Sequence, residues 1–206
     1  MSEPEKTTHQ GNEPSRPSAL PLAGWSTVYL LIPAVIFAWG WLRTPYALAV
    51  TLAAAIVIFF AIRDAWRERD RTPLIARLRP LWPALVIVLA WMLLSGIGGF
   101  GLQNGDYKSN NAMFKGLIDS PWPLEIEFSG RPVRIIYYFA YFLPAALVGK
   151  AFGWEAANVF IFFWALAGVL LAFAWFRRVS RTPDRLWPLL PLALVFCLAS
   201  GMDSVG

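Results

Sequence analysis

Five long stretches of this chain are apolar and contain no Asp, Glu, Lys or Arg, and they limit its fold more than any other feature. They are Ala19–Leu42, Thr44–Ile62, Pro80–Gly105, Ala156–Phe176 and Leu186–Met202. A charge-free apolar helix of about 17–25 residues can cross the hydrocarbon core of a bilayer, which is about 30 Å thick. The sequence therefore predicts an all-α, polytopic transmembrane helix bundle with five spans.

Composition favours the same setting. The chain is 57% hydrophobic and 15% charged, whereas a soluble domain averages about 25% charged residues. Its 11 Trp and 6 Tyr suit a protein with many side chains at the depth of the lipid headgroups. Basic residues that orient the spans explain the net charge of +5 better than a nucleic-acid partner does, so we predict no binding to nucleic acid.

The chain divides into three parts. Residues 1–18 are polar and rich in Ser, Thr, Pro and Glu, which predicts a disordered cytoplasmic tail. Residues 19–62 are predicted to form an N-terminal transmembrane hairpin, and residues 80–206 a main membrane domain with an external loop at 106–134. Because the chain stops directly after an apolar run, at Gly206, we expect it to be the N-terminal piece of a longer protein.

The arginine content of the loops predicts which side of the membrane each loop occupies. Loop Arg63–Arg79 carries six Arg against three acids, and loop Arg177–Arg185 carries four Arg against Asp184. Loop Asp106–Arg134 carries four acidic and four basic residues. Since short cytoplasmic loops are enriched in Lys and Arg, the first two loops are predicted inside, and the third outside, a bacterial-type cytoplasmic (inner) membrane.

Segment Ile135–Gly149 is free of charge but short for a span, and two interpretations stay open. If it lies at the interface, as its tyrosines at 137, 138 and 141 favour, both arginine-rich loops are cytoplasmic. If it crosses the bilayer as a sixth span, those two loops lie on opposite sides. We prefer the first arrangement, in which Pro144 does not interrupt a span.

The densest polar cluster beside any span follows a glycine-rich turn at 96–101, where glycine lets the backbone turn sharply and pass close to other groups. The cluster consists of Gln103, Asn104, Asp106, Lys108, Asn110 and Asn111. Asp106 is the candidate general base, because a carboxylate at the lip of a membrane cavity can accept a proton. The alternative is that Asp106 caps the helix that follows. Apolar residues within Asn111–Leu117 predict that this helix is short and amphipathic and lies on the membrane surface.

Three basic residues farther along suit a phosphate group. Arg131 and Arg134 precede the segment at 135–149, and Lys150 follows it. A guanidinium group can bind phosphate with two hydrogen bonds; the alternative is that these side chains bind lipid headgroups. Asp203, at the edge of the last apolar run, is a second candidate acid, because ionisable groups at such positions are costly to bury. No HExxH, CxxC or phosphate-loop motif occurs, so no metal ligands are assigned.

The order of these features resembles the GT-C-type membrane glycosyltransferases over roughly residues 80–206. The shared features are a glycine-rich turn with an early Asp, short surface helices, a Pro-x-x-x-x-Tyr-Tyr motif and a Phe-Gly pair before the next span. In this chain they are Gly98–Asp106, Asn111–Asp119, Pro132–Tyr138 and Phe152-Gly153.

The resemblance implies transfer of a sugar from a polyprenyl-phosphate donor, held among membrane lipids, to an extracytoplasmic acceptor. It places the catalytic acid of the first external loop at Asp106 and a second acid at Asp203. A basic residue before the tyrosine-rich segment would bind the lipid phosphate. The substrate-binding residues in this interpretation are Asn104, Asn110, Asn111, Arg131, Arg134 and Lys150.

The chain departs from this pattern in two places. Many members of the family have two adjacent acids in the first loop, whereas Asp106 is followed by Tyr107; no certain cofactor is implied, and a divalent metal stays open. The hairpin Ala19–Ile62 has no counterpart. Two other functions remain: a transporter segment, against which the charge-free spans argue, and a non-catalytic membrane scaffold that packs through small residues such as those at 53–55.

Overall fold

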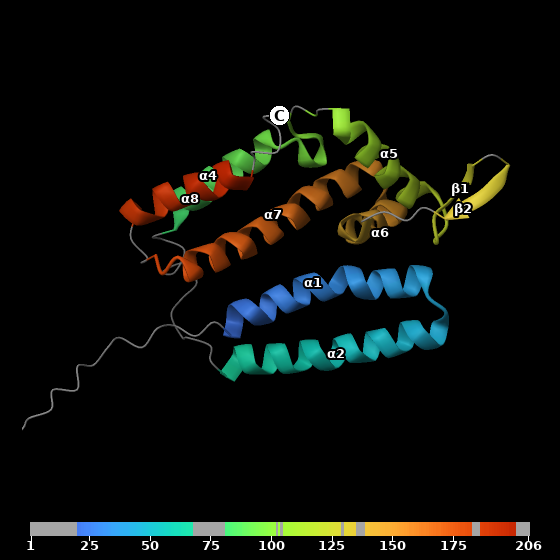
Figure 1. Ribbon diagram of the computed structural model, residues 1–206, viewed down its shortest axis with the longest axis horizontal. Coiled ribbons are helices and arrows are strands. Elements are labelled where there is room, and N and C mark those ends of the chain that lie inside the picture. Colours follow the sequence, from blue (N-terminus) through green and yellow to red (C-terminus); the bar gives the residue numbers. More distant parts are fainter. Residues whose placement is uncertain are drawn as a thin grey trace, which may run out of the picture.

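Long apolar helices run the length of the molecule, and a small polar layer lies across one end of them (Figure 1). The computed structural model describes residues 20–67, 81–101, 103, 105–128, 130–134, 139–182 and 186–200. The α-helices are α1 (Leu20–Trp41), α2 (Thr44–Arg67), α4 (Trp82–Leu94), α5 (Gly105–Asp119), α6 (Leu143–Phe152), α7 (Trp154–Val179) and α8 (Leu186–Ser200). Two 3₁₀ turns, η1 (Ile97–Gly99) and η2 (Phe139–Phe142), and two strands, β1 (Glu125–Phe128) and β2 (Arg131–Arg134), complete the described chain.

Three of the described helices are long and apolar enough to cross a membrane, namely α1, α2 and α7. Their bounds agree with the predicted spans at 19–42, 44–62 and 156–176, except that α2 and α7 each continue into a basic final turn. The arginines in these final turns stabilise the helices, because a positive charge near the carboxyl end complements the helix macrodipole.

The prediction of five spans is not confirmed. Helix α4 has 13 residues and the described part of α8 has 15, which at 1.5 Å per residue is about 20 and 23 Å against a hydrocarbon core of about 30 Å. The apolar run at 80–105 is longer than its helix because Gly96 adopts a positive φ of 80° directly after Ser95. The charge-free run is therefore longer than the helix that it contains, and a prediction from the absence of charge overestimates the length of α4.

The helices alternate in direction, so that their ends gather in two groups. Near the start of α1, Ser26 accepts a hydrogen bond of 2.9 Å from the indole nitrogen of Trp175, close to the end of α7. Farther along, Trp41 at the end of α1 stacks on Phe139 of η2 with 4.8 Å between ring centroids. The arginine-bearing ends of α2 and α7 therefore lie at one end of the bundle, and α5, α6 and the strands lie at the other (Figure 1).

Helix α4 runs antiparallel to α7, which bears on the described part of the segment at 135–149. In one buried cluster Ala84 and Val88, from the first half of α4, pack with Phe173 near the end of α7. In another, Met92 near the end of α4 packs with Phe162 in the first half of α7. The described part of the intervening segment, Phe139–Phe152, thus begins and ends at the same end of the bundle, which supports the interpretation in which it does not cross.

A two-stranded antiparallel hairpin lies in the second half of the predicted external loop at 106–134, where no strand was expected. Strand β1 pairs with β2 in the register Glu125↔Arg134 and Glu127↔Pro132, around Gly130 with φ of 74°. The sequence contains a signal for it, because Glu-Ile-Glu-Phe alternates polar and apolar residues with the period of a strand. The all-α prediction is confirmed for the fold as a whole and misses only this short element among the described residues, while the helical prediction for 111–119 is confirmed by α5.

Candidate functional site

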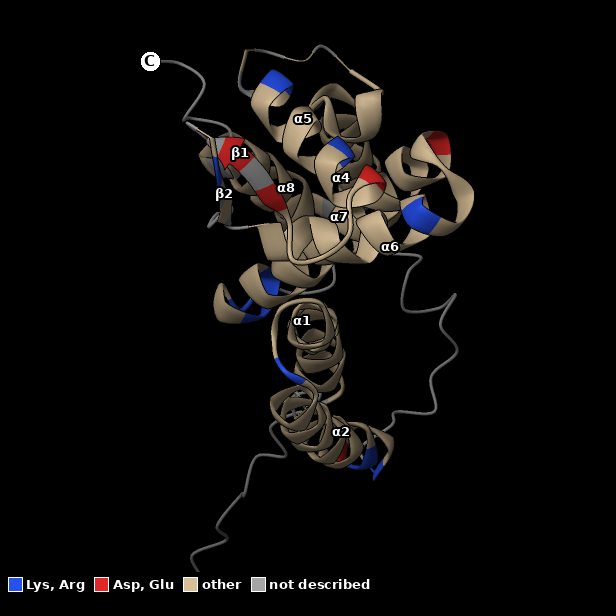
Figure 2. Cartoon of the chain, turned by 90° about the vertical axis from the view of Figure 1, so that its right-hand side faces the viewer, with Lys and Arg blue, Asp and Glu red and all other residues tan. Residues whose placement is uncertain are grey.

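Most of the described charged residues outside the long helices lie at the polar end of the bundle. Viewed from that end, Figure 2 shows Lys, Arg, Asp and Glu on α5, α6, β1 and β2, with α1 and α2 seen end-on below them. All candidate site residues that the structure describes belong to this layer.

The glycine-rich turn brings the chain from the end of α4 into α5. Gly96, Gly98 and Gly99 all have positive φ values, of 80°, 72° and 81°. At Gly98 a Cβ atom would lie only 2.6 Å from the carbonyl oxygen of Asn158 on α7. Position 98 therefore requires glycine both for its backbone angle and for close approach to α7, as the sequence predicted.

A chain of amide and hydroxyl hydrogen bonds ties the first half of α5 to this turn. The side-chain amide of Gln103 donates to the carbonyl oxygen of Gly96 at 2.9 Å. Asn111 in turn donates from Nδ2 to Oε1 of Gln103 at 3.0 Å. The hydroxyl of Tyr107 donates to the carbonyl oxygen of Ser95. The predicted binding residue Asn111 therefore positions α5 in this structure, while the half-buried Asn110 lies beside it.

Asp106 is the second residue of α5, and the structure describes only its backbone. The first helical residue is Gly105, so Asp106 lies in the first turn of α5. A carboxylate in the first turn is stabilised by the positive end of the helix macrodipole. The other proposed acid, Asp203, and the candidate Asn104 lie outside the described residues.

The amphipathic face of α5 packs onto protein. Phe114 and Leu117 are buried, and the ring of Phe114 lies 5.4 Å from that of Trp154 at the start of α7. At the next helix, a Cβ atom on Gly149 would lie 2.7 Å from Cδ1 of Ile118, so α5 and α6 approach closely at a glycine. The expectation that these apolar residues face the membrane surface is therefore wrong for the buried pair, which joins α5 to α6 and α7.

The side chain of Lys150 caps the carboxyl end of α5. Its ammonium group donates to the carbonyl oxygens of Ile118 at 3.1 Å and Ser120 at 2.5 Å, and lies 5.1 Å from the centre of the Trp122 ring. These carbonyl groups have no partner within the helix, and a cation there satisfies them. Partial burial lowers the pKa of Lys150, and the charge of Asp119 acts in the opposite direction.

The two ends of α5 carry different candidate residues. Asp106 and Ile118, whose carbonyl Lys150 binds, are separated along the helix by about 18 Å at 1.5 Å per residue. Arg131 is exposed at the start of β2, beyond the carboxyl end of α5, and of Arg134 only the backbone is described. The structure thus places Asp106, Asn110 and Asn111 in the first half of the helix and Lys150 with the hairpin at its carboxyl end.

Sequence reasoning missed a half-buried tyrosine beneath this layer, whose hydroxyl group is fully buried. We assigned Tyr141 to a membrane-surface helix, yet its ring packs with Met92, Phe162 and Ala165 between α4 and α7. Its hydroxyl is buried and has no hydrogen-bond partner among the described residues. Burial raises the pKa of Tyr141, and the nearby phenols of Tyr29 and Tyr107 raise it further. Only the Phe-Ala-Tyr-Phe composition around it indicated burial.

No cluster of three or more His, Cys, Asp or Glu side chains suited to a metal ion occurs within the described ranges. The ion pair nearest the candidate site, Lys115 with Asp119 at 2.9 Å, joins exposed side chains one turn apart on α5. A pair of this kind contributes little beyond local helix stability. The described acids therefore form no ligand set around the start of α5.

Comparison with known proteins adds no independent guide to this site. No protein-family model matches the chain. No curated protein and no solved structure matches it either.

Proposed function

We propose that the chain is an integral membrane protein whose arginine-bearing end faces the cytoplasm and whose polar layer lies at the outer face. Helices α1, α2 and α7 are long enough to cross a bilayer. Arg67 of α2 and Arg177 and Arg178 of α7 lie at the same end of the bundle (Figure 1). That grouping supports this orientation, because basic residues next to spans are retained on the cytoplasmic side.

We propose further that the polar layer transfers a sugar from a polyprenyl-phosphate donor to an extracytoplasmic acceptor. One observation carries this proposal: the glycine turn seats the start of α5, with Asp106 in its first turn, over the ends of α4 and α7. A lipid-linked donor needs this placement, because its tail lies among apolar helices while its reacting sugar meets polar groups at their ends. The resemblance to the GT-C-type enzymes agrees with this assignment.

The chemistry requires one base on the acceptor side of the sugar. Asp106 would take the proton of an acceptor hydroxyl while that oxygen forms a bond to the anomeric carbon. The bond from that carbon to the donor phosphate oxygen breaks, and its electron pair leaves with the phosphate. Asn110, one turn after Asp106 on the same helix face, would hold a sugar hydroxyl.

In this proposal the basic residues lie apart from the catalytic centre at Asp106. Groups that flank one sugar ring lie roughly 5–10 Å apart, whereas Lys150 binds α5 about 18 Å along the helix from Asp106. Lys150 therefore has a structural role in this proposal. Arg131 and Arg134, on the hairpin, would contact the acceptor or the lipid surface.

The decisive experiment is an assay of the full chain with a labelled polyprenyl-phosphate sugar. Asp106→Asn should lower transfer by on the order of 100-fold or more, since general-base catalysis contributes about 100–10,000-fold. The matched control is Asp119→Asn, at the other end of the same helix, which should retain activity. Equal transfer by both variants, with helicity unchanged, would remove Asp106 from the mechanism.

A further inference from the structure

Helix α2 lies at the outer edge of the molecule (Figure 1) and packs against protein on one side. Its partner is α1, where a Cβ atom on Gly24 would lie 2.9 Å from the carbonyl oxygen of Ala61. Leu52, Ile56 and Phe59 are exposed on α2. A helix with this apolar surface, in a chain that crosses a bilayer, meets lipid along its length.

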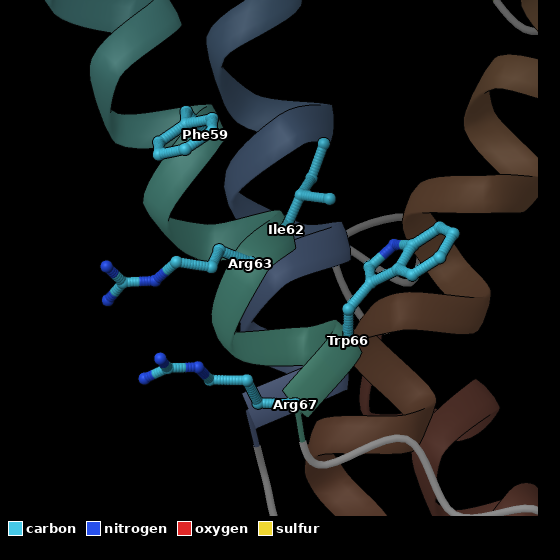
Figure 3. A pocket seen from close by; sticks show the side chains of 5 residues that line it. All are labelled: Phe59, Ile62, Arg63, Trp66 and Arg67. Atoms are coloured by element: carbon cyan, nitrogen blue, oxygen red, sulfur yellow. The ribbon is translucent and has the colours of Figure 1, made fainter.

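The last two turns of α2 combine apolar and basic side chains on one face. Phe59, Ile62, Arg63, Trp66 and Arg67 line a shallow, open pocket of about 490 Å³ on the surface of this helix. In Figure 3 the two guanidinium groups extend along one edge of this face, and Ile62 and Trp66 lie along the other. We call these five residues the α2 pocket.

Arg63 makes an exposed ion pair with its neighbour Asp64. Its Nε and Nη2 atoms donate to Oδ1 of Asp64 at 3.0 and 2.9 Å, and its guanidinium carbon lies 4.8 Å from the centre of the Phe60 ring. Because a guanidinium has five N–H donors, the Nη1 group and one Nη2 hydrogen are not used by Asp64. Arg67 lies one turn away, where two like charges repel each other unless an anion lies between them.

We propose that the α2 pocket binds the headgroup of an anionic phospholipid, with the phosphate between Arg63 and Arg67. A helix macrodipole alone explains basic residues in a final turn, but it does not explain the apolar side of the same pocket. A phospholipid matches both parts: its phosphate suits the guanidinium groups, its glycerol suits Trp66 at the same depth, and its upper acyl chains suit Ile62 and Phe59, which lie farther from the end of the helix. The site lies at the opposite end of the bundle from Asp106 and does not depend on the proposed transfer reaction.

The test uses the full chain in micelles that contain equal amounts of phosphatidylglycerol and phosphatidylcholine, with retained lipid identified by native mass spectrometry. The wild-type chain should retain phosphatidylglycerol preferentially. Arg63→Gln with Arg67→Gln should reduce this preference at least about fivefold, the effect of one basic side chain at a lipid surface. Arg63→Lys with Arg67→Lys keeps both charges and should retain most of the preference.

The matched control is Arg43→Gln, an exposed arginine in the turn at the other end of the α1–α2 hairpin, which should leave the preference unchanged. If the double glutamine variant loses helicity, Arg67→Gln alone is judged by the same criterion. No preference in the wild type, or the same loss in the Arg43 control, would overturn the proposal. Displacement of the lipid by excess inorganic phosphate would instead assign the pocket to free phosphate.

Discussion

At the scale of single residues, two tyrosines near the polar end are in opposite situations. The Tyr107 hydroxyl donates to the carbonyl oxygen of Ser95 and so helps to hold α5 on the glycine turn. The Tyr141 hydroxyl is buried without a partner among the described residues. A satisfied buried hydroxyl contributes to stability, whereas an unsatisfied one costs the free energy of removing it from water. The two positions should therefore respond to loss of the hydroxyl with opposite signs.

Tyr141→Phe should raise the free energy of unfolding by about 1 kcal/mol, because it removes a buried polar atom and keeps the ring. Thermal unfolding of the full chain in detergent, followed by circular dichroism, measures the change. Tyr107→Phe is the matched comparison and should lower stability by about 0.5–1.5 kcal/mol, the value of one hydrogen bond. A destabilised Tyr141→Phe variant would show that this hydroxyl has a partner.

The buried hydroxyl of Tyr141 also predicts that the free energy of unfolding depends on pH. An unfolded tyrosine ionises around its ordinary pKa of 10.0, while burial raises the pKa of Tyr141 in the folded chain. The folded state therefore binds more protons than the unfolded state above pH 10, and stability falls as pH rises through that range. The advantage of Tyr141→Phe over the wild type should widen above pH 10.

At the scale of elements, one glycine decides how the α1–α2 hairpin docks. Tyr29 of α1 stacks on Trp164 of α7 with 4.2 Å between ring centroids and donates to its carbonyl oxygen at 3.2 Å. A Cβ atom on Gly168, one turn later on α7, would collide with the hydroxyl group of Tyr29. The absence of a side chain at position 168 is thus what lets α1 approach α7.

Gly168→Leu should weaken this contact and destabilise the chain by about 1–3 kcal/mol through overpacking. The control is Ala167→Leu, at an exposed neighbouring position of α7, which should change stability by less. Unfolding of the double variant Gly168→Leu with Tyr29→Ala tests the cause. Its destabilisation should be smaller than the sum of the two single effects, and simple additivity would refute the proposed contact.

Sequence patterns predicted elements better than they predicted element lengths. The charge-free runs located α1, α2 and α7 because a helix that faces lipid on most sides must lack charge along its whole length. The same criterion extended the third run to Gly105, although Gly96 ends α4 far earlier. The hairpin was missed because its four-residue strands are too short to outweigh the helical pattern on either side.

At the scale of the whole molecule, the alternation of helices predicts which loops can be reached from each side of a membrane. Ser180, directly after α7, and Ser109, in α5, are both exposed and lie at opposite ends of the bundle. Cys197 is buried and can be replaced by Ala to give a chain without cysteine. Two single-cysteine variants then report the two ends separately.

In intact cells, an impermeant thiol reagent should label Ser109→Cys and leave Ser180→Cys unlabelled until the membrane is broken. Mass spectrometry of the purified chain measures the fraction labelled. The control is each variant in permeabilised cells, where both should react. The reverse pattern would place the polar layer in the cytoplasm and end the proposed role of Asp106 in external transfer.

The sequence alone determined that the chain builds apolar helices, where the longest ones lie and which loops carry arginine, because length, charge and periodicity are properties of consecutive residues. It also located the glycine turn and the polar cluster after it. Only the tertiary structure decided that Lys150 closes the end of α5 and that Tyr141 lies inside the bundle. It also separated the candidate residues between the two ends of α5. These relations join segments far apart in the chain, so they depend on the angles and contacts between helices, which no local pattern encodes.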